Sequence, residues 1–360
     1  MMDVVAELRG GVGFITLNRP KAMNALSLAM IRDLTATLLV WRDDAAVKAV
    51  AIRGQGKEGA FGAFCAGGDI RFFHQAALAG NPALEDFFTE EYTLNHLIHS
   101  YPKPYIAFMD GIVMGGGMGI SQGASLRIVT ERTKMAMPET NIGLFPDVGG
   151  GYFLSRCPGR MGEYLALTGH MLVGVDALAL GLADSLVNSA DLPALWESLG
   201  QGGFESLAGF KQQLAAKPVA SNAEVAQAQP QVDLHFSHAT VLGIAASLEA
   251  DGSTWAQETA AALRKRSPLM LHVVLEQIRR ARDMSLADDL RMERNLVRHC
   301  FHLRPGAQSE TVEGIRALAV DKDHSPKWHP ARIEDVTPEM VAPFFESPWP
   351  AHAHPLRALP

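Results

Sequence analysis

The first hundred residues alternate between the apolar spacing of strands and that of helices. Residues 4–8 and 12–18 carry alternating apolar side chains on either side of the Gly10-Gly11 pair, which predicts a β-hairpin. A helix is expected over about 28–42, with Ser27 as its N-cap. Its apolar positions recur at helical spacing and form one face: Leu28, Ile31, Leu34, Leu38 and Trp41.

A strand followed by a glycine turn and a helix start occurs twice. The apolar run at 47–54 predicts a buried strand, and the glycine motif at 63–70 then opens a helix near Asp69. A helix over about 87–100 leads to a second strand at 105–111, which runs into a triple glycine. Parallel sheets are built from such near-continuous apolar strands, so we expect an α/β fold.

The second half of the chain is expected to be mainly helical. We interpret residues 175–187 as a helix with a glycine break and 222–233 as a connecting stretch without a core face. A domain boundary near residue 200 would separate a catalytic core at 1–200 from a helical region at 201–360. Beyond the connecting stretch, helical spacing predicts four helices, at about 239–250, 255–266, 268–282 and 285–303.

Composition narrows the possible classes of protein. With 360 residues, 48% hydrophobic and 20% charged, the chain can bury a sizeable core. Its net charge of -7 argues against nucleic-acid binding, which needs a clustered basic surface. No window approaches the roughly 18 apolar residues of a membrane span, and the N-terminus lacks the pattern of a signal peptide. We therefore expect a cytoplasmic protein.

The three cysteines do not suggest a disulfide framework or a metal site. Their number is odd and their spacing is not that of metal ligands, which indicates a reducing compartment. Cys65 lies inside the first glycine motif, but its neighbours Phe64 and Ala66 are apolar. Free cysteine is among the most buried residue types, so packing is favoured over nucleophilic chemistry.

The candidate chemistry comes from two glycine segments and two acids. Residues 63–70 and 111–120 offer backbone N–H groups with little side-chain bulk, the property that lets a chain approach a developing oxyanion. Glu139 and Asp147 follow, each directly after a proline, and could act as base, nucleophile or acid. The alternatives are ordinary turn glycines and solvent-facing loop acids.

These motifs together resemble the crotonase (enoyl-CoA hydratase/isomerase) superfamily, and within it the 3-hydroxyisobutyryl-CoA hydrolase branch. The resemblance covers nearly the whole chain. It rests on NRPKAMNAL at 18–26, AFCAGGDI at 63–70, MGGGMG at 114–119, MPET at 137–140, FPDVGGGYFL at 145–154, WAQETAAALRKRSPLML at 255–271 and DKDHSPKW at 321–328.

The resemblance implies a crotonase (ClpP-like) spiral of ββα units with a helical C-terminal region. It assigns the oxyanion hole to the N–H groups of Gly68 and Gly116. Glu139 matches the catalytic glutamate shared with hydratases, and Asp147 the additional acid of the hydroxyacyl-CoA hydrolases. Glu91 matches a substrate-contacting glutamate, although a helix-surface acid is the simpler interpretation of that residue.

Coenzyme A enters as part of an acyl-CoA substrate. The resemblance places its nucleotide end near Lys21, Ala22, Ala66 and Ile70, and a solvent-exposed Lys21 is the alternative. No metal and no separate cofactor are expected. Relatives commonly form homo-oligomers, so self-association is possible here.

Position 119 favours one reaction over another. Hydratases carry a second glutamate three residues after the middle glycine, and this chain has Gly119. Hydration needs two acids around one water. We therefore expect thioester hydrolysis. The resemblance implies a small 3-hydroxyacyl-CoA as substrate, 3-hydroxyisobutyryl-CoA of valine breakdown above others. An enoyl-CoA hydratase or isomerase is the alternative, and a non-catalytic CoA-binding protein is a third possibility.

Overall fold

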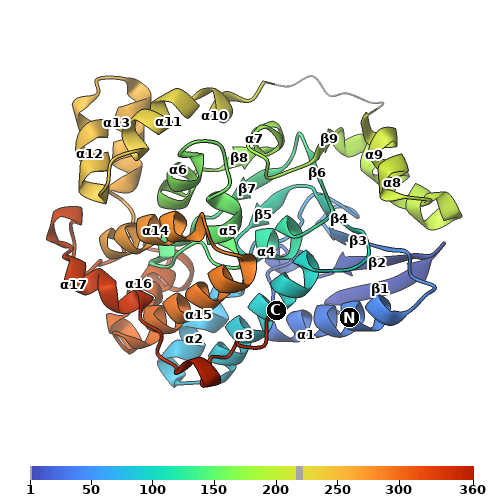
Figure 1. Cartoon of the computed structure of the whole chain (residues 1–360), viewed down its shortest axis with the longest axis horizontal. Helices are drawn as coiled ribbons and strands as arrows, with labels where there is room; N and C mark the ends of the chain where they lie inside the picture. The colour runs from blue at the N-terminus through green and yellow to red at the C-terminus, as the bar shows by residue number, and fades with distance from the viewer. Residues whose placement is uncertain (1, 216–221) are drawn as a thin grey trace. The chain divides into compact units, whose positions relative to one another are not determined.

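The N-terminal hairpin begins a six-stranded sheet. The computed structural model describes residues 2–215 and 222–360. In it the strands follow the order β1-β2-β3-β4-β6-β9, and only the β1–β2 pair is antiparallel (Figure 1). The strands are β1 (Val4–Arg9), β2 (Val12–Leu17), β3 (Ala49–Gly54), β4 (Tyr105–Met109), β6 (Leu126–Thr130) and β9 (Ser185–Val187). The predicted hairpin and the parallel arrangement are confirmed.

A second, three-stranded sheet follows from a break in the predicted strand at 105–111. β4 ends at Met109, and the chain turns through Gly111, with φ of 75°, into β5 (Ile112–Met114). β5 pairs in parallel with β7 (Lys134–Ala136), which pairs antiparallel with β8 (Leu172–Val173). The glycines of 115–117 therefore follow β5 and not β4.

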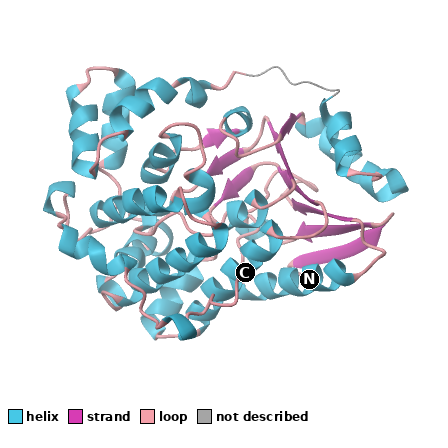
Figure 2. Cartoon of the chain, in the orientation of Figure 1, coloured by secondary structure: helices cyan, strands magenta, loops and turns pink. Residues whose placement is uncertain are grey.

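The described residues separate into two compact units, each built from three segments. The first comprises Met1–Gly68, Thr93–Ala136 and Met171–Gln227, and the second comprises Asp69–Tyr92, Met137–His170 and Ala228–Pro360. The strands of the described residues are magenta in Figure 2, and by their residue ranges they all belong to the first unit. Residue 200 lies within the first unit, so the division expected there does not coincide with these units and stays a prediction about domains.

The first unit packs its helices around the six-stranded sheet. Ser27 caps α1 (Leu28–Asp43) by accepting from the Met30 N–H, as predicted. Phe14 and Phe108 of the sheet meet Trp196 in edge-to-face contacts at 4.7 and 5.3 Å between ring centroids. The other helices wholly in this unit are α4 (Gly116–Gln122), α7 (Gly174–Ala179), α8 (Leu192–Ser198), α9 (Leu207–Ala215) and α10 (Glu224–Gln227). Helix α3 (Ala83–His99) has residues in both units.

The second unit is helical. Its four longest C-terminal helices confirm the predicted ones: α12 (Val241–Ala250), α13 (Thr254–Leu263), α14 (Pro268–Ala281) and α15 (Leu286–His302). The remaining helices are α2 (Ile70–Ala79), α5 (Gly150–Leu154), α6 (Met161–Thr168), α11 (Gln229–Phe236), α16 (Glu310–Ile315) and α17 (Pro338–Val341). The apolar sides of α14 and α15 are buried, which is the physical reason for their clear spacing in the sequence.

Two predictions of local structure are wrong. The helix expected over 175–187 is confirmed only as far as Ala179, where α7 ends before Gly181; beyond the break the prediction is wrong, because residues 185–187 pair with β6 as β9. The sheet supplies the hydrogen bonds that the local sequence does not specify. Residues 222–233 are not a bare connection, because they form α10 and begin α11, where Val232 is buried. These short helices gain their stability from tertiary packing, which propensity does not report.

Candidate active site

The two glycine motifs lie side by side in the first unit. Cys65 forms a parallel bridge with Val113: its N–H donates to the Ile112 carbonyl at 2.9 Å, and its carbonyl accepts from the Met114 N–H at 3.0 Å. A Cβ atom added at Gly67 would lie 3.7 Å from the Gly116 nitrogen. Cys65 is fully buried, so the packing role predicted for it is confirmed.

The close approach of these motifs requires glycine at 117. A Cβ atom there would lie 2.4 Å from the Cys65 carbonyl oxygen, which no side chain could accommodate. Within the described residues, neither the Gly68 nor the Gly116 N–H donates a hydrogen bond. Gly116 is the first residue of α4, where the N–H groups have no partner inside the helix. The role of the two N–H groups in holding an anionic oxygen stays a prediction.

The three predicted acids lie together in the second unit. Glu91 comes from α3, Glu139 begins a 3₁₀ turn at Glu139–Ile142, and Asp147 precedes α5. Their exposed fractions are 2%, 7% and 6%. Asp147 Oδ2 accepts a hydrogen bond of 2.9 Å from the Tyr92 hydroxyl. The surface interpretations of Glu91, Glu139 and Asp147 are therefore wrong.

Burial makes all three carboxyls harder to ionise, and the charges of neighbouring acids add to this effect at Glu91 and Glu139. Burial raises the pKa of Glu91 well above its usual range, and the charges of Asp147 and Glu139 raise it further. The pKa of Glu139 is raised by burial and then by Asp147. Burial raises the pKa of Asp147 to about 7, against the lowering effect of the Tyr92 hydrogen bond.

Two of the acids each have a carboxyl oxygen that is available to a ligand. Within the described residues, Glu91 Oε1 and Glu139 Oε2 are buried and make no hydrogen bond. Because a buried oxygen without a donor is costly, such atoms are expected where a ligand or water completes the site. The cluster can therefore accept a proton from a small polar molecule, or orient that molecule by a hydrogen bond.

The sequence interpretation missed residues that complete this cluster. Tyr92 donates to Asp147, and Asp289 and Glu293 of α15 accept from the backbone that follows Asp147. Tyr92 directly follows Glu91 in the sequence, and this adjacency to a candidate residue could have marked it as part of the site. Asp289 and Glu293 lie four residues apart and so share a helix face with the apolar positions of α15, which could have marked them as buried.

The residues expected to hold the nucleotide end of coenzyme A divide between the units. Lys21 is exposed, while Ala22 and Ala66 are half-buried in the first unit. The Ala66 N–H donates to the Met23 carbonyl at 3.0 Å, which holds the two motifs together. Ile70 is the first residue of α2 in the second unit. Their role in binding stays a prediction.

Asp69 fits a structural role. Its side chain caps α2 by accepting from the Phe72 N–H, as expected for an N-cap.

Among residues 2–215 and 222–360, no three His, Cys, Asp or Glu side chains gather in a way that could hold a metal ion. No helix of the described chain is both long and apolar enough to cross a membrane.

Comparison with known proteins identifies the family. A model of the family described as enoyl-CoA hydratase/isomerase matches residues 12–345. The chain belongs to this family. The crotonase fold expected from the motifs is therefore confirmed.

Curated relatives of the chain include proteins named as hydrolases. The chain is 42% identical over 351 residues to the mitochondrial 3-hydroxyisobutyryl-CoA hydrolase of Rattus norvegicus, which covers 96% of this chain and 89% of that protein. The human protein of the same name is 39% identical over the same shares of both chains.

Solved structures of similar shape carry other names. A carnitinyl-CoA dehydratase from Mycobacterium thermoresistibile matches with a TM-score of 0.89 and 38% identity, covering 97% of this chain and 98% of that one. An enoyl-CoA hydratase from Rhodobacter sphaeroides matches with a TM-score of 0.87 and 37% identity, covering 96% and 98%. Both the fold and the length of this family member are thus shared with solved proteins.

Proposed function

We propose that this family member is an acyl-CoA thioester hydrolase, and that it releases coenzyme A from 3-hydroxyisobutyryl-CoA. The observation that carries the proposal is the buried carboxyl of Asp147, hydrogen-bonded by Tyr92 beside Glu139, in a chain that has Gly119 where hydratases place a second acid. The curated relatives, which are named for this activity, support it. Its product would belong to valine breakdown.

In the proposed reaction the thioester oxygen accepts hydrogen bonds from the N–H groups of Gly68 and Gly116. Negative charge on this oxygen grows in the transition state, so preorganised donors lower the barrier. The carboxylate of Glu139 either attacks the carbonyl carbon or takes a proton from an attacking water. Attack by the carboxylate breaks the C–S bond and leaves the acyl group as a mixed anhydride with Glu139, which water then hydrolyses to the free acid and the free side chain. In the general-base route water itself displaces the thiolate. In both routes the CoA thiolate leaves and takes up the proton that the water gives up.

The raised pKa values suit this chemistry. Burial raises the pKa of Glu139, and a carboxylate with a raised pKa is a stronger base than an ordinary glutamate side chain. Asp147, with a pKa of about 7, can orient the water or the 3-hydroxyl group of the substrate in either protonation state. Glu91, with its free buried oxygen, is placed to accept a hydrogen bond from the acyl group.

The competing function is hydration of an enoyl-CoA, the activity for which the Rhodobacter sphaeroides structure is named. Thiol release from 3-hydroxyisobutyryl-CoA, measured beside the loss of the double-bond absorbance of crotonyl-CoA, separates the two activities. Hydration faster than thiol release from any 3-hydroxyacyl-CoA would reject the proposal. A single turnover in ¹⁸O water then tests the nucleophilic role of Glu139: label in its side chain demonstrates attack by the carboxylate, because the general-base route puts the label only into the released acid.

Other properties of the enzyme stay predictions. Coenzyme A would enter as part of the substrate, and no cofactor is required by the proposed steps. The cytoplasmic location and possible self-association remain expectations, and the two relatives quoted are mitochondrial by name.

A further inference from the structure

Two buried acids of α15 hold the backbone that follows Asp147. Glu293 Oε2 accepts from the Gly149 N–H at 2.8 Å, and Oε1 accepts from the Gly151 N–H at 3.0 Å. Four residues earlier on the same helix, Asp289 Oδ2 accepts from the Tyr152 N–H at 2.8 Å. Glu293 and Asp289 are both fully buried. Three hydrogen bonds therefore join α15 to the backbone of residues 149–152.

The backbone before Asp147 is held by α14. Gln277 Nε2 donates to the Pro146 carbonyl at 2.7 Å and lies 3.3 Å from Glu293 Oε1, to which it also donates. Gln277 is fully buried. The backbone on both sides of Asp147 is therefore held by side chains of α14 and α15. Gln277 and Glu293 of this set are also hydrogen-bonded to each other.

The turn itself is strained and closely packed. Val148 has φ of 57°, a conformation that a β-branched residue adopts only when its surroundings enforce it. A Cβ atom added at Gly151 would lie 2.3 Å from Asp289 Oδ1, so glycine is required for the approach of α15. Without the contacts from α14 and α15 we expect the turn to relax and the Asp147 carboxyl to lose its orientation toward Tyr92.

The surroundings of Glu293 explain why an acid stands there. The charged or titratable groups that face it are Asp289 on its own helix, Asp147 on the turn and Tyr92 on α3, while Arg156 acts on Asp289. Burial and the charge of Asp289 raise the pKa of Glu293, and its hydrogen bonds from Gly149 and Gly151 oppose that shift. A carboxyl offers two acceptor oxygens to these two N–H groups. A glutamine offers one and turns its NH₂ toward the other donor.

We propose that Glu293, together with Gln277 and Asp289, is a positioning residue that holds Asp147 in its working orientation. The inference rests on the proposed hydrolase function and assigns to α14 and α15 a role in the reaction. It predicts that removing these contacts lowers turnover without weakening substrate binding, since no contact with substrate is lost.

The test compares Glu293→Gln with wild type in thiol release from 3-hydroxyisobutyryl-CoA. We expect kcat to fall by at least about tenfold, as small misplacements in an active site cost this much or more, with KM changed by less than about twofold. In an Asp147→Asn background, Glu293→Gln should lower kcat by less than about twofold, because its effect is transmitted through Asp147. Equal losses in the two backgrounds would overturn the proposal.

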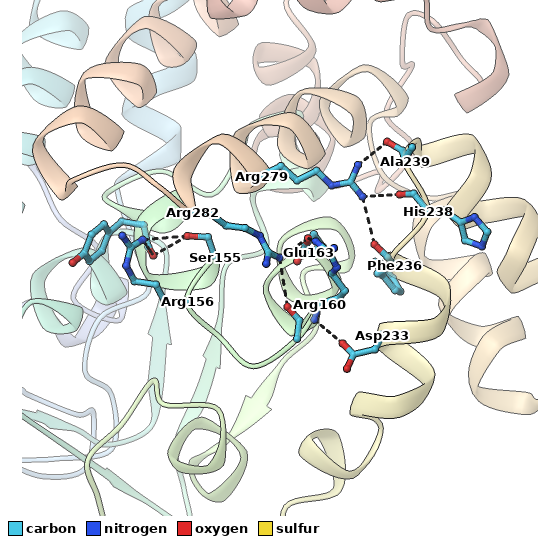
Figure 3. Close-up of polar contacts among 12 residues, drawn as sticks. Ser155, Arg156, Arg160, Glu163, Asp233, Phe236, His238, Ala239, Arg279 and Arg282 are labelled. Carbon is cyan, nitrogen blue, oxygen red and sulfur yellow. Dashed lines mark hydrogen bonds and ion pairs between the residues drawn. The ribbon is translucent and has the colours of Figure 1, made fainter.

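Glu163→Gln is the matched control. Glu163 is also a fully buried glutamate of the second unit, but it pairs with Arg160 at 2.9 Å and Arg282 at 2.7 Å (Figure 3). Its loss should lower Tm and leave kcat within about twofold of wild type, since its carboxylate contacts Arg160 and Arg282 and not the backbone of residues 146–152. A similar fall in kcat for Glu163→Gln would show that any buried lesion has this effect and would refute a specific role.

Gln277→Met provides a second variant if Glu293→Gln does not fold. It keeps the side-chain volume and removes the donor to the Pro146 carbonyl, so the same loss of kcat at constant KM is expected. If wild type is active and Gln277→Met has an unchanged kcat, the positioning role is overturned and the proposed hydrolase function still stands. A wild type that releases no thiol from any 3-hydroxyacyl-CoA overturns the proposed function, and the inference with it.

Discussion

The clearest physical consequence of the site is a pH-dependent stability cost of the Asp147 carboxyl. Its pKa is about 7 in the folded chain against an ordinary value of 3.8. A raised acid pKa means that ionisation opposes folding. The cost is absent below pH 3.8, grows as pH rises and is complete above pH 7. The replacement Asp147→Asn removes the charge, and the asparagine oxygen can still accept from Tyr92.

The size of the effect follows from the two pKa values. At about 1.4 kcal/mol for each pKa unit, full ionisation of Asp147 costs the folded state about 4 kcal/mol. At pH 5 the unfolded carboxyl is already ionised and the folded one is still protonated. Because pH 5 lies closer to the unfolded pKa of 3.8 than to the folded pKa of about 7, less than half of the full cost is present there. The stability gained by Asp147→Asn should therefore increase by roughly 2–3 kcal/mol between pH 5 and pH 8.

Urea denaturation of wild type and Asp147→Asn at pH 5, 6, 7 and 8 measures this change directly. The quantity compared is the difference in the free energy of unfolding between the variant and wild type. Any effect of the substitution that does not depend on pH is the same at each pH and cancels. Asp43→Asn is the control: its carboxyl is exposed and Arg42 lowers its pKa, so the difference from wild type should stay constant over this range. A constant difference for Asp147→Asn as well would refute the assignment of a raised pKa to Asp147.

Three further predictions concern catalysis. Glu139→Gln should lower thiol release by at least about a hundredfold with the fold intact by circular dichroism, since acid–base groups contribute this much, and near wild-type turnover would reject Glu139. Asp147→Asn should retain coenzyme A affinity in calorimetry and lose turnover, the pattern of an interaction made in the transition state; lost affinity with unchanged kcat would make Asp147 a binding residue. Gly119→Glu should depress hydrolysis, because Gly119 is buried and a glutamate would crowd its surroundings, whereas unchanged thiol release would show that position 119 does not shape the site.

Much of the architecture could be read from local patterns. The hairpin at Gly10-Gly11, the Ser27 cap and the four C-terminal helices have spacings that only one kind of element satisfies, and the structure agrees with each. The errors fall where local signals are weak. Residues 185–187 become β9 because β6 offers an open edge, and no property of those three residues predicts it.

The sequence by itself determined the family, the glycine motifs and the identity of Glu91, Glu139 and Asp147 as candidates, because residue types at fixed spacing carry that information. Only the tertiary structure decided that these acids are buried together with raised pKa values. The physical reason is distance along the chain: the Tyr92 hydroxyl reaches Asp147 across 55 residues, and Glu293 reaches Gly149 across 144. Burial and charge coupling arise from such contacts, which local spacing does not encode.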